Sequence, residues 1–362
     1  MHVCLTSIEL FPDKVHGGFG RATRTIGREL VRRGVGVTVV VPRRSQAHPE
    51  EYELDGMRVL QFDPRRPWRA IDLYRSCDAD VYHSQDTSLG TRLAMRARPD
   101  RPHIITFRDP MDSRDWEIET RYSGHGRVGW SLYRTFIDGP LVATAVVRAD
   151  ARFCAAEFLR AKVRHKYGLK TEPGFLPTPV GVPDRVAKSA RPTVCYVGRW
   201  EGRKRPERFF ELARACPDIH FIAAGDAQDA TRDRELRASC SDLPNLELTG
   251  FIDQFSSDGV ARVLEQSWIL VNTSAREGLP NVFLEACAHR CALLSYTDPD
   301  GFASRFGVLA TDEPGALRAG LEHLLDGDRW QRYGQRGYEH VRDVFSTDRA
   351  MDAHLDVYGR FD

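Results

Sequence analysis

Two stretches in the second half of the chain carry side chains suited to binding a diphosphate. The first is residues 198–204 (GRWEGRK), which follows an apolar run typical of a strand and precedes Pro206, a residue suited to the first turn of a helix. Glycine lets a backbone approach a ligand, and Arg199 and Lys204 add two positive charges. The stretch predicts a phosphate clamp that needs no metal. A solvated turn with basic residues is the alternative interpretation.

The second stretch is residues 274–286 (SAREGLPNVFLEA), which also follows a predicted strand. Pro280 suits the start of a helix, where backbone N–H groups have no intrahelical partner and can bind an anion. The amides expected at this site belong to Gly278, Leu279, Asn281 and Val282. Glu277 precedes the helix and Glu285 lies within it. Carboxylates accept hydrogen bonds from sugar hydroxyls but repel phosphates, so the two stretches together suit a ligand with both groups.

Alternating strand and helix patterns must position these residues. Continuous Val/Ile/Leu runs separated by helical patterns predict parallel sheets built from βαβ units. Expected strands cover residues 3–5, 37–41, 81–83, 103–107, 193–197, 220–224, 246–249 and 268–272, and expected helices cover residues 21–33, 130–148, 206–215 and 282–289. The fold class is α/β, with two doubly wound Rossmann-like domains and the ligand in the cleft between them.

Clustered Pro and Gly after residue 170 predict the boundary between the two domains, because neither a helix nor a central strand continues through them. We therefore expect an N-terminal domain over residues 1–170, a linker over residues 171–190 and a C-terminal domain over residues 191–340. A helix over residues 341–362 is expected to close the fold by packing back on the N-terminal domain.

Composition excludes several classes of protein. The chain has 362 residues, 41% hydrophobic and 28% charged, with a net charge of +1, which is unlike a disordered, fibrous or membrane-spanning protein. Residues 1–190 carry 31 Lys and Arg against 23 Asp and Glu, which indicates an anionic partner for the first half. The basic residues are dispersed, so nucleic acid is not expected.

The cysteines and the apolar runs bear on location. None of the eight cysteines shows the spacing of a zinc or redox motif, which favours a reducing compartment and therefore the cytoplasm. The N-terminus has no features of a secretory leader. The longest apolar run, residues 35–41, is too short to cross a bilayer, so any membrane contact is expected to be peripheral, at the inner face of the cell membrane.

Together these motifs resemble retaining glycosyltransferase family 4, whose members have the GT-B fold. The resemblance rests on a glycine loop at residues 15–21 (VHGGFGR), on residues 198–204, on residues 243–245 (LPN) before residues 250–252 (GFI), and on two glutamates separated by seven residues. It covers most of the chain, and it implies that residues 1–170 bind the acceptor and residues 191–340 bind the nucleotide sugar. It implies transfer of a sugar from a UDP- or GDP-type nucleotide diphosphate sugar to an acceptor hydroxyl, with retention of configuration and without a metal or other cofactor.

The resemblance also implies roles for individual residues. Arg199 and Lys204 grip the diphosphate, Glu277 contacts the transferred sugar, and Glu285 holds the ribose. Arg199, Lys204 and Glu277 are thus the catalytic candidates. The remaining donor-binding residues are Gly18 and Phe19 in the glycine loop, Gly198 at the start of the first stretch, Phe251 and Ile252 near the base, and the amides of Gly278, Leu279, Asn281 and Val282.

The chain departs from the family where many members carry a His-Asp pair, because Arg108 and Asp109 stand there. Arginine cannot act as a base at neutral pH, so we hypothesise that Arg108 recognises an anionic group on donor or acceptor, or fixes Asp109. His83 at a strand end is a further acceptor-binding candidate, with a satisfied structural histidine as the alternative. His16 is a weaker candidate of the same kind.

Mechanism and alternatives follow from the same residues. A front-side attack assisted by the leaving phosphate is favoured, and a covalent intermediate on Asp109 or Asp86 is the alternative.

A nucleotide-sugar epimerase and a non-catalytic nucleotide-binding protein stay open as alternative functions. A dinucleotide-dependent dehydrogenase is disfavoured, because Thr23 stands where a glycine or alanine would complete the fingerprint. The acceptor is expected to be a glycan, a glycolipid or a phosphorylated molecule. Residues 65–74 (RRPWRAIDLY) form a candidate membrane-contact patch, with an ordinary basic surface helix as the alternative.

Overall fold

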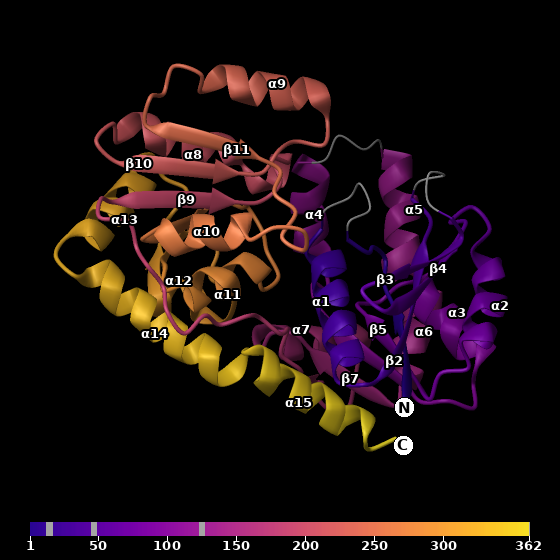
Figure 1. Cartoon of the computed structure of the whole chain (residues 1–362). Coiled ribbons are helices and arrows are strands. Elements are labelled where there is room, and N and C mark those ends of the chain that lie inside the picture. Colours follow the sequence, from indigo (N-terminus) through magenta and orange to yellow (C-terminus); the bar gives the residue numbers. More distant parts are fainter. Residues whose placement is uncertain (12–16, 45–48, 123–126, 362) are drawn as a thin grey trace. The chain divides into compact units, whose positions relative to one another are not determined.

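The chain folds into two compact units. The structure is a computed structural model that describes residues 1–11, 17–44, 49–122 and 127–361. Unit 1 comprises Met1–Asp112, Gly124–Pro179 and Thr347–Asp362, and unit 2 comprises Ser113–Ser123 and Val180–Ser346. The chain therefore passes between the units more than once (Figure 1).

Unit 1 is built on a sheet in which every strand but one pairs in parallel. In the described residues its order is β3-β4-β2-β1-β5-β6-β7-β8, and β3 is the antiparallel strand, at one edge. Its strands are β1 (His2–Thr6), β2 (Gly36–Pro42), β3 (Glu51–Leu54), β4 (Met57–Phe62), β5 (Val81–Gln85), β6 (His103–Phe107), β7 (Ala151–Cys154) and β8 (Gly174–Phe175). The chain order reverses between β1 and β5, which makes this pair a topological switch point.

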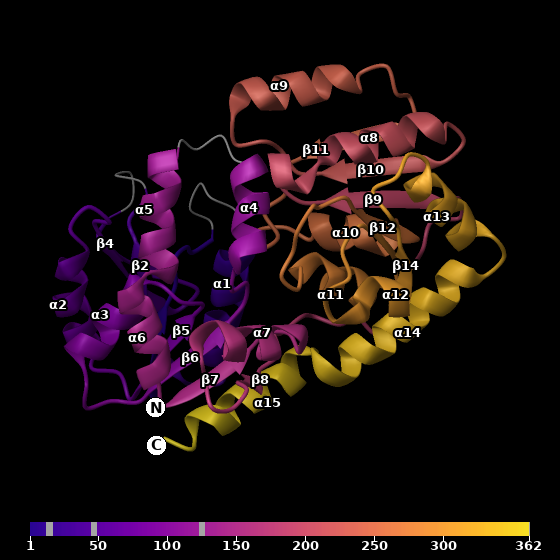
Figure 2. The ribbon, with the colours of Figure 1, turned by 180° about the vertical axis from the view of Figure 1, so that it is seen from behind.

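Helices cover both faces of this sheet, as its continuous Val and Ile runs require. They are α1 (Gly18–Arg32), η1 (Pro67–Arg69), α2 (Ala70–Cys77), α3 (Leu89–Ala97), α5 (Arg127–Asp138), α6 (Pro140–Arg148), α7 (Phe158–Tyr167) and α15 (Thr347–Tyr358). One apolar core joins β1, β2 and β4 to α1 and α15 through residues such as Ile26 and Met351. A second core on the opposite face joins the same strands to α2 and α3 and includes Tyr74 and Leu93. Figure 2 shows α2 and α3 from behind.

Unit 2 contains a wholly parallel sheet among its described residues, in the order β11-β10-β9-β12-β13-β14. Its strands are β9 (Thr193–Val197), β10 (His220–Ala224), β11 (Leu246–Gly250), β12 (Ile269–Asn272), β13 (Ala292–Ser295) and β14 (Gly307–Leu309). Counted along the unit, this is the 3-2-1-4-5-6 order of a Rossmann sheet, with its switch point between β9 and β12.

The helices of unit 2 include one from the first half of the sequence. They are α4 (Ser113–Tyr122), η2 (Gly202–Lys204), α8 (Pro206–Ala215), α9 (Ala230–Ser239), α10 (Gly259–Gln266), α11 (Asn281–Ala288), η3 (Pro299–Gly301), α12 (Phe302–Phe306), α13 (Ala316–Leu325) and α14 (Arg329–Val344). An aromatic core holds the sheet to α8 and α13, with Trp200, Phe209 and Phe221 fully buried. The predicted domain boundaries did not assign α4 to this unit.

The structure confirms each predicted strand to within two residues at its ends, and it corrects two of the helices. The expected helix over residues 130–148 is two helices, α5 and α6, which meet at Gly139-Pro140 because proline has no N–H to continue the first helix. The expected closing helix begins later than residue 341, since α14 ends at Val344 and α15 starts at Thr347. Strands β3, β4, β7, β8, β13 and β14 were not predicted.

Candidate active site

The predicted phosphate-binding residues of unit 2 lie on the two loops that flank its switch point. The first loop follows β9 and the second follows β12, and these strands are neighbours in the sheet. Thr273 Oγ1 donates to the carbonyl oxygens of Lys204 and Arg205 at 2.7 and 2.9 Å, and Ala275 N donates to Arg203 O at 2.9 Å. Hydrogen bonds between the loops thus fix their relative positions at the carboxyl ends of the strands, where ligands of such sheets bind.

Lys204 and Glu277 form an ion pair across these loops, with Lys204 Nζ donating to Glu277 Oε1. Asn272 Nδ2 lies 3.5 Å from the same oxygen, and the Glu277 side chain is only 7% exposed. Burial alone would raise the pKa of the Glu277 carboxyl, but the charges of Lys204 and Arg203 outweigh it and lower the pKa to about 2. Burial lowers the pKa of Lys204, although Glu277 opposes this effect. The pair places a cation and an ionised carboxylate side by side at the switch point.

Arg199 lies on the first of these loops and is partly exposed. Its guanidinium pairs with Glu201 at 2.9 Å, and its carbonyl accepts from the Tyr196 hydroxyl at 3.1 Å. Gly198 N donates to Ala224 O at 3.0 Å, which ties the start of the loop to the end of β10. Arg199 and Lys204 are therefore brought to one edge of the sheet, as predicted from their spacing.

Arg205 also lies on this loop and was not among the predicted site residues. Its backbone is left-handed, with φ of 48°, a conformation that costs a non-glycine residue about 1 kcal/mol or more. Its buried guanidinium donates to Thr273 O at 2.8 Å and to Asp312 at 2.5 Å, and it stacks 4.7 Å from the Tyr296 ring. These contacts offset the backbone strain. The signal available in sequence was the run of three basic residues over 203–205, directly before Pro206.

The second loop ends at α11, which starts at Asn281 with Pro280 as its N-cap. The amide-bearing residues predicted to face an anion sit at this helix start: Gly278 is buried, and Leu279, Asn281 and Val282 are half-buried. Glu285 lies in the second turn of the helix and is also half-buried, with its carbonyl accepting a hydrogen bond from the His289 ring at 2.8 Å.

Phe251 and Ile252 follow β11, the strand at the edge of the sheet. The β11 loop is tied to the β10 loop by a hydrogen bond of 2.9 Å from Gly225 N to Gly250 O. Phe251 is 40% exposed, so part of the residue is accessible to solvent. All donor-binding residues predicted in unit 2 thus lie at the carboxyl edge of the same sheet.

In unit 1 the predicted glycine loop leads into α1, which begins at Gly18. Gly18 is exposed and Phe19 half-buried, and the Glu9 carboxylate accepts a hydrogen bond of 3.0 Å from Gly20 N. A carboxylate of this chain therefore lies at the start of α1, close enough that a Cβ on Gly17 would overlap it. His16 and the preceding loop lie outside the described residues.

His83 is fully buried in a polar network in the middle of β5, so its predicted place at a strand end is wrong. Its Nε2 bonds Thr106 Oγ1 at 2.7 Å, and its Nδ1 bonds the Tyr358 hydroxyl at 2.7 Å. Burial lowers the pKa of His83 well below its ordinary value, so the ring is neutral. The structural alternative for His83 therefore has direct support, while contact with an acceptor stays an untested prediction.

Arg108 belongs to the same network and is 7% exposed. Its guanidinium donates to Gln85 Oε1 at 2.5 Å and to Thr178 Oγ1 at 2.8 Å, and Gln85 Nε2 lies 3.2 Å from His83 Nδ1. Burial lowers the pKa of Arg108 to about 10, so it remains charged at neutral pH. The network connects Arg108 to His83 through one glutamine.

Asp86 marks the carboxyl end of β5 at the switch point of unit 1. Its φ is 90°, a strained value for a residue with a side chain, and it is 8% exposed. Its carboxylate accepts from Thr87 N at 2.7 Å and from Asp109 N at 3.1 Å. Burial raises its pKa to about 6. Asp86 and Asp109 are therefore adjacent, and a strained, perturbed carboxylate at a strand end is typical of functional sites.

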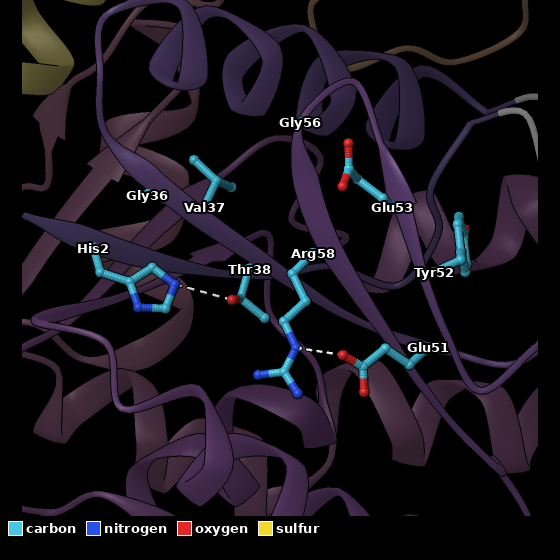
Figure 3. A pocket seen from close by; sticks show the side chains of 9 residues that line it. All are labelled: His2, Gly36, Val37, Thr38, Glu51, Tyr52, Glu53, Gly56 and Arg58. Atoms are coloured by element: carbon cyan, nitrogen blue, oxygen red, sulfur yellow. Dashed lines mark hydrogen bonds and ion pairs between the residues drawn. The ribbon is translucent and has the colours of Figure 1, made fainter.

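A hollow of about 590 Å³ in unit 1 lies away from these residues (Figure 3). Its lining includes His2, Thr38 and Arg58, which sit at or near the amino ends of their parallel strands. His2 bonds Thr38 at 2.9 Å, and Arg58 bonds Glu51 at 2.7 Å. Because the candidate site lies at carboxyl ends, this hollow is not part of it.

Two features are absent from the described residues. No three His, Cys, Asp or Glu side chains in that part of the chain gather as a metal site would require. Within the same residues, no helix combines the length and the apolar character needed to cross a bilayer.

Comparisons with known proteins agree with this geometry. The family model described as Glycosyltransferase Family 4 matches residues 16–180, and the one described as Glycosyl transferases group 1 matches residues 191–327. No curated protein matches the chain.

Solved structures match over nearly the whole chain. Sucrose-phosphate synthase from Thermosynechococcus elongatus is 15% identical, with a TM-score of 0.77 over 99% of this chain and 98% of that one. HepE from Anabaena, in complex with UDP and glucose, is 12% identical, with a TM-score of 0.71 over 99% and 100%. The pneumococcal O-GlcNAc transferase GtfA, in complex with UDP and GlcNAc, is 10% identical, with a TM-score of 0.71 over 99% of each chain. The fold is GT-B, with two Rossmann-like domains, as predicted. The chain belongs to glycosyltransferase family 4.

Proposed function

We propose that the chain is a retaining glycosyltransferase that moves a sugar from a UDP- or GDP-type nucleotide sugar to an acceptor hydroxyl. The observation that carries the proposal is the pairing of Lys204 with Glu277 between two hydrogen-bonded loops at the switch point of unit 2. A cation next to an ionised carboxylate suits a ligand that carries phosphates at one end and hydroxyls at the other. That HepE and GtfA were solved with UDP and a sugar supports this donor class.

Each group at the site has a part in the proposed reaction. Breaking the bond to the anomeric carbon builds negative charge on the departing diphosphate. Arg199, Lys204 and the amides at the start of α11 stabilise that charge, and they act more strongly on the transition state than on the ground state. Glu277 orients the sugar hydroxyls, Glu285 holds the ribose, and backbone near Phe251 and Ile252 contacts the base.

We further propose that these cations and amides act in place of a metal, so that no cofactor is required. In the favoured mechanism the acceptor attacks from the same face that the diphosphate leaves, and the leaving phosphate oxygen takes its proton. Activity that is unchanged in excess EDTA supports the first point, and the anomeric configuration of the product, read by NMR, tests retention. A covalent sugar adduct on Asp86 or Asp109 would overturn the front-side mechanism.

The acceptor is proposed to be a glycan, a glycolipid or a phosphorylated molecule bound through the first half of the chain. The excess of basic over acidic residues in residues 1–190 supports an anionic acceptor. Nucleic acid is not proposed as a partner.

We also propose a cytoplasmic location with peripheral contact at the inner face of the cell membrane. The predicted patch over residues 65–74 needs correction, because Tyr74 is buried in the core and only Trp68, at 60% exposure, is a large exposed apolar residue there. Leu132 and Leu141 add exposed apolar surface on α5 and α6. Co-sedimentation with phosphatidylglycerol vesicles, lost in a Trp68→Ser variant, would support the contact, and equal sedimentation of both proteins would remove the support from Trp68.

A two-stage experiment tests the enzyme class. A thermal-shift screen across nucleoside diphosphates and their sugars identifies the donor, because a ligand that binds only the native state raises apparent stability. Release of free nucleoside diphosphate is then followed with and without candidate acceptors. Acceptor-dependent release supports a transferase, conversion of the donor without an acceptor supports an epimerase, and binding without turnover supports a non-catalytic protein.

Variants in the same assay identify the residues. Arg199→Ala and Lys204→Ala are expected to lower kcat by about 100-fold or more, as loss of a transition-state charge contact does. Arg208→Ala is the matched control, since Arg208 lies on the adjoining α8 and is exposed. Equal activity of all three variants would contradict the proposed site.

A further inference from the structure

Helix α4 lies against the loop that follows β9 in unit 2, where it contacts η2, although α4 comes from the first half of the sequence (Figures 1 and 2). The end of α4 and η2 approach so closely that a Cβ added to Gly202 would lie 2.5 Å from Tyr122 O. Glycine at position 202 thus permits backbone-to-backbone contact two residues before Lys204. A helix packed this closely limits where the loop can move.

Glu119 of α4 connects the two loops of the candidate site. Its Oε1 accepts from Arg276 Nε and Nη2 at 3.3 and 3.1 Å, and it lies 3.4 Å from Arg203 Nε. Arg276 directly precedes Glu277, and Arg203 directly precedes Lys204. The Glu119 side chain is 13% exposed and that of Arg276 is 7% exposed, so the charges are largely shielded from water.

Arg203 also approaches Glu277. Its Nη1 lies 3.9 Å from Glu277 Oε2 and donates to Arg276 O at 3.3 Å. Glu119 and Glu277 therefore share one guanidinium. If the charge of Glu119 were removed, Arg203 and Arg276 would lose their common anchor, and Glu277 would face an unbalanced second cation beside Lys204.

We propose that α4 is part of the donor site and that Glu119 is a positioning residue. It holds Arg203 and Arg276 so that Lys204 and Glu277, each the next residue along the chain, meet in the geometry that binds the nucleotide sugar. This inference rests on the proposed function and adds to it a residue that does not touch the substrate. It also makes donor affinity depend on a helix outside the C-terminal half of the sequence.

Glu119→Gln tests the proposal, with Glu117→Gln as the matched control. Glu117 lies on the same helix and carries the same charge but is exposed. Below the melting temperature of both variants, Glu119→Gln is expected to weaken UDP or GDP binding by calorimetry and to lower kcat/KM for the nucleotide sugar by about 10- to 100-fold. Glu117→Gln is expected to match wild type. If the two variants have the same nucleotide affinity and the same kcat/KM, whether reduced or unchanged, the proposal is overturned.

A double-mutant cycle separates positioning from a general loss of stability. Glu119→Gln and Arg276→Gln are combined, and because both remove the same interaction, the double variant is expected to lose no more nucleotide affinity than the worse single variant. If the two single losses of nucleotide affinity add up fully in the double variant, the proposal is overturned. If Glu119→Gln does not fold, Glu119→Asp keeps the charge but shortens its reach. The Asp variant is then expected to show a reduced kcat/KM, and wild-type kinetics would overturn the positioning role.

The two proposals fail in different ways. If wild-type protein binds no nucleoside diphosphate, the proposed function fails. If wild type binds and turns over the nucleotide sugar while Glu119→Gln does so equally well, only the role of α4 fails.

Discussion

Lys204 donates a hydrogen bond to Glu277 although the two residues follow different strands and are far apart in the sequence. The strands β9 and β12 that carry their loops are neighbours only because the chain order of the sheet reverses between them. A Rossmann sheet thus brings a cation from one loop to a carboxylate from the other at the edge where ligands bind. The contact links the topology of unit 2 to its chemistry.

Breaking this buried pair from one side is expected to destabilise the protein. Lys204→Met leaves Glu277 buried without its main counter-charge, so we expect the free energy of unfolding to fall by about 3–5 kcal/mol, measured by urea denaturation. The double variant Lys204→Met/Glu277→Leu is expected to recover much of the stability, because no uncompensated charge remains. It should stay inactive, since both groups proposed to bind the nucleotide sugar are gone. Recovery of activity together with stability would show that the pair serves the fold and not the reaction.

Asp86 is expected to make stability depend on pH. Its folded pKa of about 6 lies above the ordinary value for aspartate, so the protonated form favours the folded state. This contribution is present below about pH 4 and is lost as the pH rises through 6. Between pH 4.5 and 7.5, wild type should therefore lose about 2 kcal/mol more stability than Asp86→Asn.

The test compares how steeply the free energy of unfolding of the two proteins falls with pH, and not how stable they are at any one pH. An asparagine amide must turn one N–H toward a backbone donor, which adds a cost at every pH. Urea denaturation of both proteins at the two pH values gives the slopes. Identical slopes would mean that the pKa of Asp86 is not raised in the folded protein.

Gly225 is expected to tolerate no side chain. Its φ is 145°, and a Cβ there would lie 1.9 Å from Gly198 O, at the start of the loop that follows β9. Gly225→Ala should therefore lower the free energy of unfolding by about 2–4 kcal/mol and weaken nucleoside diphosphate binding at temperatures where it remains folded.

Gly327→Ala serves as the control for Gly225→Ala. Gly327 also has a positive φ, of 64°, but no atom lies within 4 Å of its added Cβ. A cost of about 1–2 kcal/mol from the backbone alone, with unchanged nucleotide binding, is expected. If the two variants behaved alike, the steric contact with Gly198 would have no measurable effect.

Sequence patterns predicted the parts of the fold that depend on local periodicity. The strand over residues 193–197 and the helix over residues 206–215 match β9 and α8 residue for residue, because apolar runs and a proline at a helix start are local signals. Strand β3 carried no such signal. It is an edge strand in which exposed and half-buried residues alternate, and its pairing with β4 is a long-range property of the sheet.

The residues of the candidate site also fall into those that sequence patterns could predict and those that they could not. Arg199, Lys204, Glu277 and Glu285 could be found because their types and spacing form motifs. Glu119 could not, since its helix has no marker of function and its contacts with Arg203 and Arg276 arise only once α4 packs on unit 2. Ion pairs between distant segments depend on tertiary structure, so sequence spacing gives no access to them.

Arg108 provides a test of how far the departure from the family pattern affects substrate choice. Its guanidinium satisfies Gln85 and Thr178 in a buried network, so Arg108→Met should leave both acceptors without a charged donor and lower the free energy of unfolding by about 2–4 kcal/mol. Kinetics at a temperature where the variant is fully folded then decide its role. A raised KM for donor or acceptor with a smaller change in kcat is expected if Arg108 recognises an anionic group. If both KM values and kcat match wild type, Arg108 acts only in the network that holds Gln85 and His83, and the hypothesis of anion recognition is wrong.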